Sequence, residues 1–356
     1  MAPRALTRCS IVPPYLLDRI AASADGPEGL LAGPARRTLA TDARLRAARP
    51  ERARAAVGPV EPGPQRTVSD ARGTTELPGD VVRGEDDPPT GDPAVDEAHD
   101  GLGATWALLL EAFARDSLDG AGRPLPATVH YGRRYDNAFW DGERMVFGDG
   151  DGQVFGRFTA SLSVIGHELG HGVVQHTADL PYRGQSGALN ESVADVLGAL
   201  VEQHAAGQSA EEATWLIGRG LFRPGVRGVA LRSMAAPGTA YDDPVLGRDP
   251  QPGHMDGYVI TEEDDGGVHL NSGIPNRAFH LTATALGGRA WERAGRVWYD
   301  ALLDPRLAPA SGSGAPDFAR FAAVTADAAV RRWGAASPEV EAVRAAWDGV
   351  GVVPEG

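Results

Sequence analysis

The sequence predicts an α+β protein of two lobes, in which a strand-bearing N-terminal lobe and a helical C-terminal lobe meet at a central helix. Two stretches before residue 160, "ATVHYG" and "RMVFGDGDGQVFGRF", alternate or run apolar between Gly and Asp turns, as strands do. From Leu162 onward, apolar residues recur mostly at helical spacing. Between the two regions lies "SLSVIGHELGHGVVQH", which is apolar enough to be a buried helix.

The first 58 residues look like a separate basic segment. Residues 1–60 hold ten arginines against five acidic residues, whereas the rest of the chain is strongly acidic. Within this segment "PPYLLDRIAAS" predicts an extended start and a short amphipathic helix, and residues 35–58 predict either a solvated helix or an exposed linker, which proteases cut readily. We therefore expect three parts: 1–58, the N-terminal lobe with the central helix at 59–177, and the helical lobe at 178–353.

The remaining elements follow from periodicity and turn residues. Residues 59–91 are rich in Pro, Gly and Asp, which predicts loops and short strands. Residues 94–113 place Ala, Leu and Phe at helical spacing. Further helices are expected at 162–176, 187–206, 210–219, 272–286, 289–303, 315–334 and 337–348.

The composition excludes several classes of protein. A net charge of −14 argues against a nucleic-acid binder, because phosphate recognition needs clustered basic residues. The chain has no run of about 18 apolar residues, and Pro13, Pro14 and Asp18 interrupt its start, so neither a membrane span nor an ordinary export signal is predicted. The single cysteine, Cys9, excludes an intramolecular disulfide framework. We expect a globular monomer.

The central helix carries His167, Glu168 and His171 in the order His-Glu-x-x-His. Four residues turn an α-helix by about 40° beyond one full turn, so the two imidazoles project side by side and can bind one zinc ion. Glu168 lies next to that face, where it can take a proton from a metal-bound water. The alternative is a buried helix whose histidines are satisfied within the core, and the pentapeptide alone does not decide between the two.

A catalytic zinc needs a third protein ligand. The long metzincin signature would place Gly and His where this chain has Val174 and Thr177, so that option fails. The other option is a carboxylate from a second helix, and "GALNESVADVLGALVE" offers Glu191, with Asp195 one turn further on to fix the tautomer of a ligand histidine. Both acids could be solvated, but their apolar neighbours predict a buried helix, where carboxylates need partners.

Six motifs in sequence order make residues 67–352 resemble the thermolysin family of zinc endopeptidases: "NAFW", "MVFGDGDG", "HELGH", "SGALNESVAD", "ALRSM" and "DDGGVHLNSGIPN". The resemblance implies a two-lobed thermolysin-like fold and a zinc-dependent neutral endopeptidase that acts on peptides and proteins. It assigns one zinc ion to His167, His171 and Glu191, the three residues that the spacing also indicates.

The resemblance also implies the catalytic roles. Bound zinc lowers the pKa of its water toward about 7, and Glu168 acts as general base on that water. His269 and Tyr182 match the positions that stabilise the oxyanion, and Asp264 matches the residue that orients His269. By itself, His269 would be interpreted as a surface loop histidine.

Substrate contacts are implied in the same way. Asn137 and the backbone of Ala138 match the edge that pairs with an extended peptide, and Arg232 matches the arginine that holds the carbonyl after the scissile bond. The pocket for the next side chain is matched by apolar residues that would otherwise be taken as core: Phe155, Phe158, Val164, Ile217 and Leu231. We therefore expect cleavage on the amino side of bulky hydrophobic residues.

One departure from the family concerns calcium. At the positions of its paired calcium site, Glu202 is retained, but the others hold Ser163, Thr214, Leu216 and Arg219. A hard cation needs several oxygen ligands, so we predict that the paired site is absent. The "GDGDG" stretch and Asp92 or Asp96 leave weaker calcium binding open.

The second departure is the short N-terminal segment, which resembles the propeptide of the protealysin-like branch through Pro13, Pro14, Tyr15 and Leu16. A rigid Pro-Pro segment can lie in a substrate cleft with little loss of entropy and resist hydrolysis. We expect residues 1 to about 55 to inhibit the enzyme in cis until the Arg-rich linker is cut. Cys9 is either a small apolar residue, the favoured interpretation, or a thiolate that closes the open position of the zinc.

Two alternative functions and the cellular location of the protein remain to be considered. A catalytically dead homologue would be expected to have lost Glu168, His269 or a ligand, and an aminopeptidase would need an acidic anchor and lack the "NAFW" edge. The absence of an export signal predicts a cytoplasmic protein, whereas the resemblance implies secretion by a route independent of a signal peptide.

Overall fold

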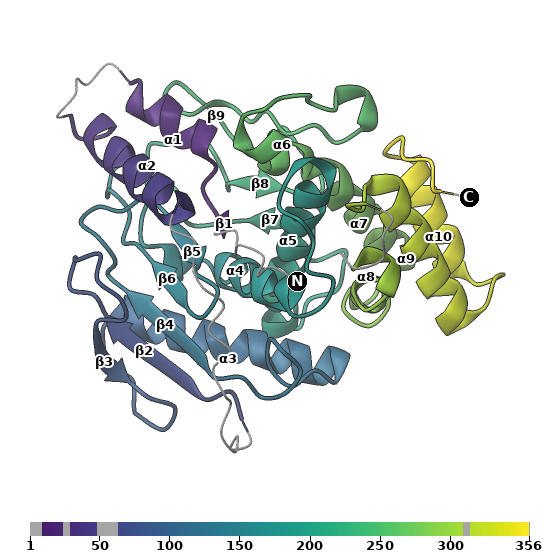
Figure 1. Ribbon diagram of the computed structural model, residues 1–356, viewed down its shortest axis with the longest axis horizontal. Coiled ribbons are helices and arrows are strands. Elements are labelled where there is room, and N and C mark those ends of the chain that lie inside the picture. Colours follow the sequence, from purple (N-terminus) through teal and green to yellow (C-terminus); the bar gives the residue numbers. More distant parts are fainter. Residues whose placement is uncertain (1–8, 24–28, 48–62, 309–313, 356) are drawn as a thin grey trace.

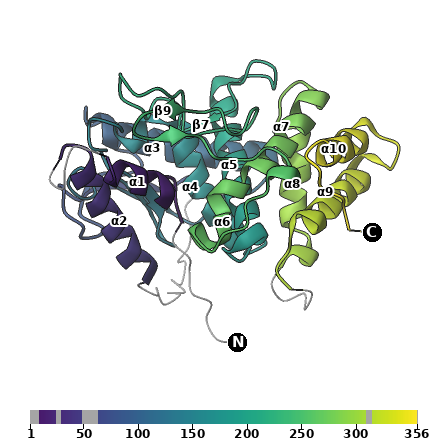
Figure 2. The same ribbon diagram turned by 90° about the horizontal axis from the view of Figure 1, so that it is seen from above.

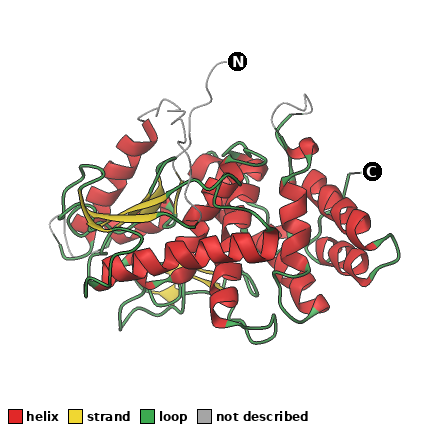
Figure 3. Ribbon diagram, turned by 90° about the horizontal axis from the view of Figure 1, so that it is seen from below, coloured by secondary structure: helices red, strands yellow, loops and turns green. Residues whose placement is uncertain are grey.

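The computed structural model describes residues 9–23, 29–47, 63–308 and 314–355. It confirms the predicted α+β class, with the six-stranded sheet at one end of the molecule and the last helices of the chain at the other (Figures 1 and 3). The second half of the predicted Arg-rich linker lies outside the described residues. Among the described helices, none has the length and apolar character needed to cross a membrane.

The N-terminal lobe is built on a six-stranded sheet with the order β1-β5-β6-β4-β2-β3. β4 runs parallel to β2 and β6, and the other neighbours are antiparallel. The strands are β1 (Cys9–Ser10), β2 (Arg66–Asp70), β3 (Asp80–Arg83), β4 (Leu125–Val129), β5 (Ala138–Trp140) and β6 (Met145–Phe147). The basic segment therefore contributes a strand to the sheet of the lobe that follows it.

Helices α3 (Pro93–Phe113) and α4 (Leu162–Gln175) pack against this sheet, and α4 continues into the centre of the molecule. Side chains alternate between the two faces of a strand. In β5, Ala138 and Trp140 accordingly join the main apolar core, whereas Phe139 joins a small separate cluster on the opposite face.

Close packing of α4 against α5 (Gly184–Ala206) depends on glycines that let the two backbones approach. A Cβ on Gly198 would lie 2.3 Å from the carbonyl oxygen of Ser163, and a Cβ on Gly170 would lie 2.9 Å from the Cα of Ala194. A larger residue at either position would push the helices apart. This approach brings the histidines of α4 next to the carboxylates of α5.

The C-terminal lobe consists mainly of α6 (Asp264–Asn271), α7 (Gly273–Leu286), α8 (Ala294–Leu302), α9 (Phe318–Trp333) and α10 (Pro338–Asp348). Its core includes Trp298 and Trp347, whose rings stack with centroids 6.0 Å apart. The short pairs β7 (Leu216–Ile217) with β8 (Arg232–Ser233) and β9 (Asp242–Asp243) with β10 (Gly247–Arg248) connect α5 to α6. The described residues also contain three 3-10 turns, Phe158–Ala160, Met255–Gly257 and Pro305–Leu307.

Two sequence-based expectations were wrong. The helix predicted at 210–219 does not form, because Leu216 and Ile217 pair with β8 and Trp215 adopts a left-handed backbone. Tertiary pairing overrides a helical pattern here. The solvated helix predicted within 35–58 does form, as α2 (Ala32–Ala47), but one of its faces is buried against the sheet lobe (Figure 2). α1 (Pro14–Ala21) is the short amphipathic helix that was expected.

Candidate functional site

In each of the two histidines of α4, His167 and His171, the Nδ1 atom points away from the other ring and the Nε2 atom points toward it. Nδ1 of His167 donates to Asp195 at 2.7 Å, and Nδ1 of His171 donates to Asn190 at 2.8 Å. The two Nε2 atoms lie 3.1 Å apart. Because each Nδ1 already has an acceptor, each Nε2 can present a lone pair to a shared cation.

Glu191 completes this group from α5. Its carboxylate lies 3.6 Å from Nε2 of each histidine, and its Oε2 has no hydrogen-bond partner among the described residues. Ligand atoms about 2.1 Å from a tetrahedral zinc lie roughly 3.4 Å from one another, so these separations suit zinc. The donor set of two imidazoles and one carboxylate, nearly inaccessible to solvent, therefore fits this metal.

Arg232 and Asn276 support the cluster through Asp195. Arg232 donates to both oxygens of that carboxylate, at 2.9 and 2.7 Å, and Asn276 donates to it at 2.7 Å. Burial alone would raise the pKa of Asp195, but Arg232 and His167 hold it below its ordinary value. Burial lowers the pKa of His171 to about 4, so this ring is neutral and available as a ligand.

Glu168 lies on the same helix with one oxygen fixed and one free. Oε2 accepts from the backbone N–H of Trp140 at 2.9 Å, whereas Oε1 has no partner of normal geometry in the described part of the chain. Burial and the charge of Glu191 raise the pKa of Glu168 well above its ordinary value. A buried carboxylate with one free oxygen is suited to accepting and returning a proton.

His269 and Tyr182 approach the cluster from the C-terminal lobe. Asp264 accepts from Nδ1 of His269 at 2.6 Å and from its backbone N–H at 2.9 Å. Burial would lower the pKa of His269, but Asp264 and Glu191 raise it to about 9. The Tyr182 hydroxyl donates to Glu191 and lies 3.3 Å from Nε2 of His269. Two donors thus converge beside the predicted metal site.

Residues 9–12 run through the site along β5. His269 donates to the carbonyl of Ser10 at 3.2 Å, and Arg232 donates to that of Ile11 at 3.0 Å. Ile11 N–H donates to the Ala138 carbonyl at 3.1 Å, and the Asn137 side chain accepts from Val12 N–H at 2.9 Å. The residues predicted to bind substrate therefore bind the chain's own N-terminal segment.

These contacts are not made by the predicted inhibitory element, Pro13, Pro14, Tyr15 and Leu16. Those residues form the start of α1, with Pro13 as its N-cap. The residues that reach Asn137 and Arg232 are instead Ile11 and Val12. The predicted pocket residues are all buried in the main apolar core, which also contains Ile11, Val12 and Leu16: Phe155, Phe158, Val164, Ile217 and Leu231.

Cys9 does not behave as a plain apolar residue. Its Sγ lies 2.6 Å from Oε1 of Glu191 and 2.8 Å from the Tyr182 hydroxyl. Together with His167, His171 and Glu191 it forms a group whose ligand atoms all lie within 4.8 Å of one another. The sulfur therefore stands where it could reach the same cation as the three predicted ligands.

The acids considered for weaker calcium binding accept from protein donors, although Oδ2 of Asp151 has no hydrogen-bond partner among the described residues. Asp96 accepts from Arg83 at 2.9 Å and from the backbone of Thr90 and Gly91. In the "GDGDG" stretch, Oδ1 of Asp151 accepts three backbone N–H groups, and Asp92 and Asp149 both contact His130.

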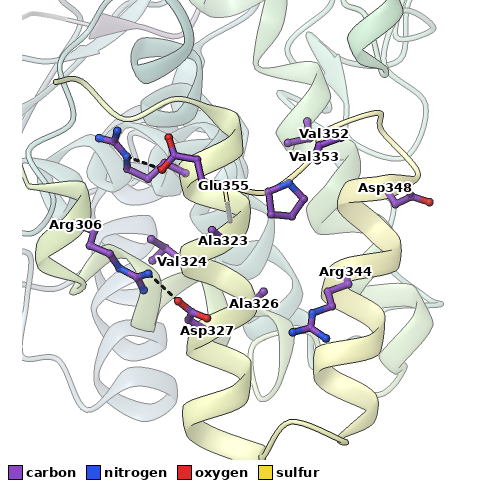
Figure 4. A pocket seen from close by; sticks show the side chains of 12 residues that line it. Arg306, Ala323, Val324, Ala326, Asp327, Arg344, Asp348, Val352, Val353 and Glu355 are labelled. Carbon is purple, nitrogen blue, oxygen red and sulfur yellow. Dashed lines mark hydrogen bonds and ion pairs between the residues drawn. The ribbon is translucent and has the colours of Figure 1, made fainter. Parts of the chain in front are cut away.

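A cavity of about 670 Å³, which shares no lining residue with this cluster, lies between α9, α10 and the C-terminal residues (Figure 4). Four of its charged side chains form two ion pairs: Arg306 with Asp327, and Arg320 with Glu355. The groups that line it include neither a histidine nor a cysteine.

Asn190 and Asn276 are contributors that sequence reasoning missed. Asn190 directly precedes Glu191, and its side-chain N–H donates to the carbonyl of Leu180 at 3.1 Å, which fixes its side-chain oxygen toward His171. Its place next to a predicted ligand was the only sequence signal. Asn276 ends the last of the six motifs but contacts Asp195 only through the folding of α7 onto α5.

Two family models match nearly all of the chain outside its first 62 residues. One describes the thermolysin metallopeptidase catalytic domain and covers residues 63–175, and the other describes the thermolysin metallopeptidase alpha-helical domain and covers residues 178–352.

Individual relatives match the same family as the two models. "Extracellular metalloprotease" of Pectobacterium carotovorum subsp. carotovorum is 49% identical over 351 residues, which is 97% of this chain and 96% of the relative. "Thermolysin" of Alicyclobacillus acidocaldarius subsp. acidocaldarius is 37% identical over 292 residues, 80% of this chain but only 50% of that protein. Among solved structures, the precursor of protealysin, a metalloproteinase from Serratia proteamaculans, matches with a TM-score of 0.86 and 49% identity over 97% of this chain and 100% of that one.

Proposed function

This chain belongs to the thermolysin family of zinc metallopeptidases, and we propose that it cleaves peptide bonds on the amino side of bulky hydrophobic residues with Glu168 as general base. It is a metalloendopeptidase made as a zymogen. We assign residues 1–58 to the propeptide and its linker, 59–177 to the N-terminal catalytic lobe and 178–353 to the C-terminal lobe.

The observation that carries the proposal is the way residues 10–12 lie in the groove. Their backbone is held as an extended peptide, with the Ser10 carbonyl at His269, the Ile11 carbonyl at Arg232 and Val12 at Asn137. Strand addition of this kind binds any sequence through main-chain groups. In a substrate, the bond at the place of Ser10–Ile11 would be the one that is cut.

The roles of the side chains follow from this placement. Zinc, held by His167, His171 and Glu191, would supply a Lewis acid that lowers the pKa of a water toward about 7. Glu168 accepts a proton through its free oxygen and returns it to the departing amine. His269 and Tyr182 donate to the substrate oxygen as charge develops on it.

Four residues orient other side chains or the substrate and do not themselves react: Asp195, Asp264, Arg232 and Asn137. Asp195 fixes the ring of His167 and holds the guanidinium of Arg232, while Asp264 keeps His269 turned toward the groove. The specificity proposal rests on Ile11, a fully buried aliphatic residue at the position after the bond. The apolar residues assigned to its pocket are Phe155, Phe158, Val164, Ile217 and Leu231.

A set of quenched fluorescent peptides tests the activity and the specificity together. After removal of the propeptide, peptides with Leu, Ile or Phe after the scissile bond should be cut at least tenfold faster than a peptide with Asp there, because burying one aliphatic side chain is worth about 1.5–3 kcal/mol. A zinc chelator should stop cleavage and added zinc restore it. Equal rates for all four peptides would refute the specificity, and chelator-resistant cleavage would refute the mechanism.

We propose further that latency depends on Cys9 as well as on the Pro13–Leu16 element. Its sulfur lies beside Glu191 and Tyr182, where it can occupy the remaining position on the zinc. Changing Cys9 to Ser should raise the activity of the uncut chain. If the Cys9→Ser chain stays as latent as the parent, Cys9 is only a packing residue. Deletion of residues 1–58 without any gain in activity would contradict the whole inhibitory role.

Calcium independence, a monomeric state and export are also proposals. Glu202 is the one retained acid of the paired calcium site, and its close polar neighbours are Ser163 and Arg219, which cannot replace acidic ligands. Activity that requires calcium in addition to zinc would contradict calcium independence.

Light scattering tests the second proposal, the monomeric state. The third proposal is export: a relative named "extracellular" supports it over a cytoplasmic location, and mass spectrometry of culture medium should find a chain that begins between residues 45 and 65.

A further inference from the structure

The peptide bond between Ser10 and Ile11 lies in the groove in the way that a substrate bond would. β1 runs antiparallel to β5, with Ser10 opposite Phe139. An extended substrate adds to the edge of a sheet by the same kind of pairing. Both residues of the bond are buried, Ile11 completely. The chain therefore presents one of its own peptide bonds to its proposed active site.

The contacts around this bond are those that hydrolysis needs. His269 donates to the carbonyl of Ser10 at 3.2 Å, and Arg232 donates to the carbonyl of Ile11 at 3.0 Å. The N–H of Ile11, whose nitrogen would leave, donates to the carbonyl of Ala138 at 3.1 Å. A bond held in place on both sides has already lost the freedom that slows a reaction in solution. These contacts favour cleavage, so another feature must protect the bond.

The register of the segment selects this bond over its neighbours. A shift by one residue would turn Ile11 away from the main apolar core, in which it is fully buried. The extended run also ends at Pro13, the N-cap of α1, which limits sliding along the groove. Ile11 is an aliphatic residue directly after the bond, as the proposed specificity requires. We therefore expect any cut in this segment at Ser10–Ile11.

The Cys9 thiol is the feature that opposes cleavage. Its Sγ lies 2.6 Å from Oε1 of Glu191 and 2.8 Å from the Tyr182 hydroxyl, which itself donates to Glu191. Tyr182 is thus held by the thiol and the carboxylate instead of donating to the Ser10 carbonyl. The ligand atoms of Cys9, Glu191 and the two histidines of α4 also lie within 4.8 Å of one another, so the sulfur competes for the place that the attacking water needs.

We propose that Ser10–Ile11 is a cleavage site for the chain's own active site and that the Cys9 thiol keeps it uncut. The proposal rests on the proposed function and adds the propeptide itself as a substrate. Without the thiol, the oxygen of a water bonds to the Ser10 carbonyl carbon, and the C–N bond breaks. Its electron pair stays on the Ile11 nitrogen, which takes the proton of the water through Glu168. The products are residues 1–10 with a new carboxylate and a chain that begins with the Ile11 ammonium.

The test follows the intact mass of full-length chains incubated with zinc. In Cys9→Ser, we expect residues 1–10 to be lost on the order of 10²-fold faster than in the parent, because the Tyr182 donor is released. Cys9→Ala should behave alike, and it decides if a lowered melting temperature shows that Cys9→Ser is misfolded. Ser10→Ala, an equally small change beside a retained thiol, should stay as intact as the parent.

A mixture separates cleavage within a chain from cleavage between chains. An isotope-labelled chain with both Cys9→Ser and Glu168→Gln is incubated with unlabelled Cys9→Ser. Only the unlabelled chain should lose residues 1–10, at a rate that does not change with concentration. Loss of residues 1–10 from the labelled chain would show that one chain cuts another, and would overturn cleavage of the bond in its own groove.

A second readout does not depend on cleavage. In the Glu168→Gln background, the cobalt-substituted chain should show the absorption band of a thiolate bound to cobalt, and Cys9→Ser should abolish that band. A chain with Cys9 present but without the band would contradict the protective role of the thiol.

The remaining outcomes separate this inference from the proposed function. An intact bond in both Cys9→Ser and Cys9→Ala, while the form lacking residues 1–58 cuts the fluorescent peptides, would overturn the inference and leave the function standing. Equally fast loss of residues 1–10 from the parent and Cys9→Ser would show that the thiol protects nothing. A form lacking residues 1–58 that cuts no peptide would overturn the proposed function, and the inference with it.

Discussion

Two clusters of histidine and carboxylate in this protein use imidazole in opposite ways. In the proposed zinc cluster, made of His167, His171 and Glu191 with Asp195 and Asn190 behind them, the two Nε2 atoms face each other at 3.1 Å. In the second cluster, His130 lies between Asp149 at 2.9 Å and Asp92 at 3.1 Å, one carboxylate on each ring nitrogen.

The difference decides which cluster can hold a metal. Hydrogen bonds that His130 donates to Asp149 and Asp92, opposed only partly by burial, raise the pKa of His130 to about 9, so the ring is a cation and has no lone pair to offer. His130 therefore forms ion pairs that link Asp92, at the start of α3, to Asp149, in the loop after β6. Histidines with one acceptor each, and with their other nitrogens turned together, remain neutral ligands.

The largest expected effect tests the chemistry that only the zinc cluster has. Glu168→Gln removes the carboxylate that accepts the proton and should lower the rate of peptide cleavage by about 10²–10⁴-fold, the range for loss of a general base. Zinc content should stay that of the parent, since Glu168 is not a proposed ligand. Glu262→Gln, exposed on the surface, is the control. Undiminished cleavage by the Glu168→Gln chain would remove Glu168 from the mechanism.

The second effect separates the two clusters directly. Asp195→Asn loses the charged acceptor of His167 and should weaken zinc binding about 10–100-fold, as removal of such outer partners does. Chelator competition measures the affinity. The matched change in the second cluster, Asp149→Asn, should leave zinc affinity unchanged; a similar loss in both variants would mean that the clusters are not independent.

A smaller effect is expected at Asn190, which is a neutral acceptor. Asn190→Ala should weaken zinc binding by about tenfold, at the low end of such effects, because the ring of His171 loses its fixed orientation. Asn190→Asp, which restores an acceptor, should recover most of the affinity. If Asn190→Ala binds zinc as the parent does, packing alone orients His171.

The smallest effect belongs to the His130 cluster and depends on pH. A histidine whose pKa is higher in the folded state stabilises the protein fully below its unfolded pKa of about 6.5, and that stabilisation is lost as pH rises through about 9. His130→Gln should therefore lower the free energy of unfolding by roughly 2 kcal/mol at pH 6, allowing for partial exposure. Urea unfolding at pH 6 and pH 10 should show the gap between parent and variant closing, and a constant gap would exclude the charge as its cause.

Much of the site could be predicted because its residues follow local rules. His167 and His171 share a face through helix geometry, and the carboxylates of α5 were recognised because acids on an apolar helix need partners. The two-lobed fold was confirmed, since strand alternation and helix periodicity are visible within short windows. The helix expected at 210–219 failed where pairing with β8 outweighed the local pattern.

By itself, the sequence determined the family, the order of the motifs and the donor set suited to zinc. Each of these is recognised from the residue types present and from short spacings between them along the chain. Only the tertiary structure decided what the first residues do. It placed Cys9 next to Glu191, 182 positions away, and Asp42 on Asn137, 95 positions away. No local pattern encodes such contacts, because they form only when β1 joins the sheet edge and α2 folds onto its outer face.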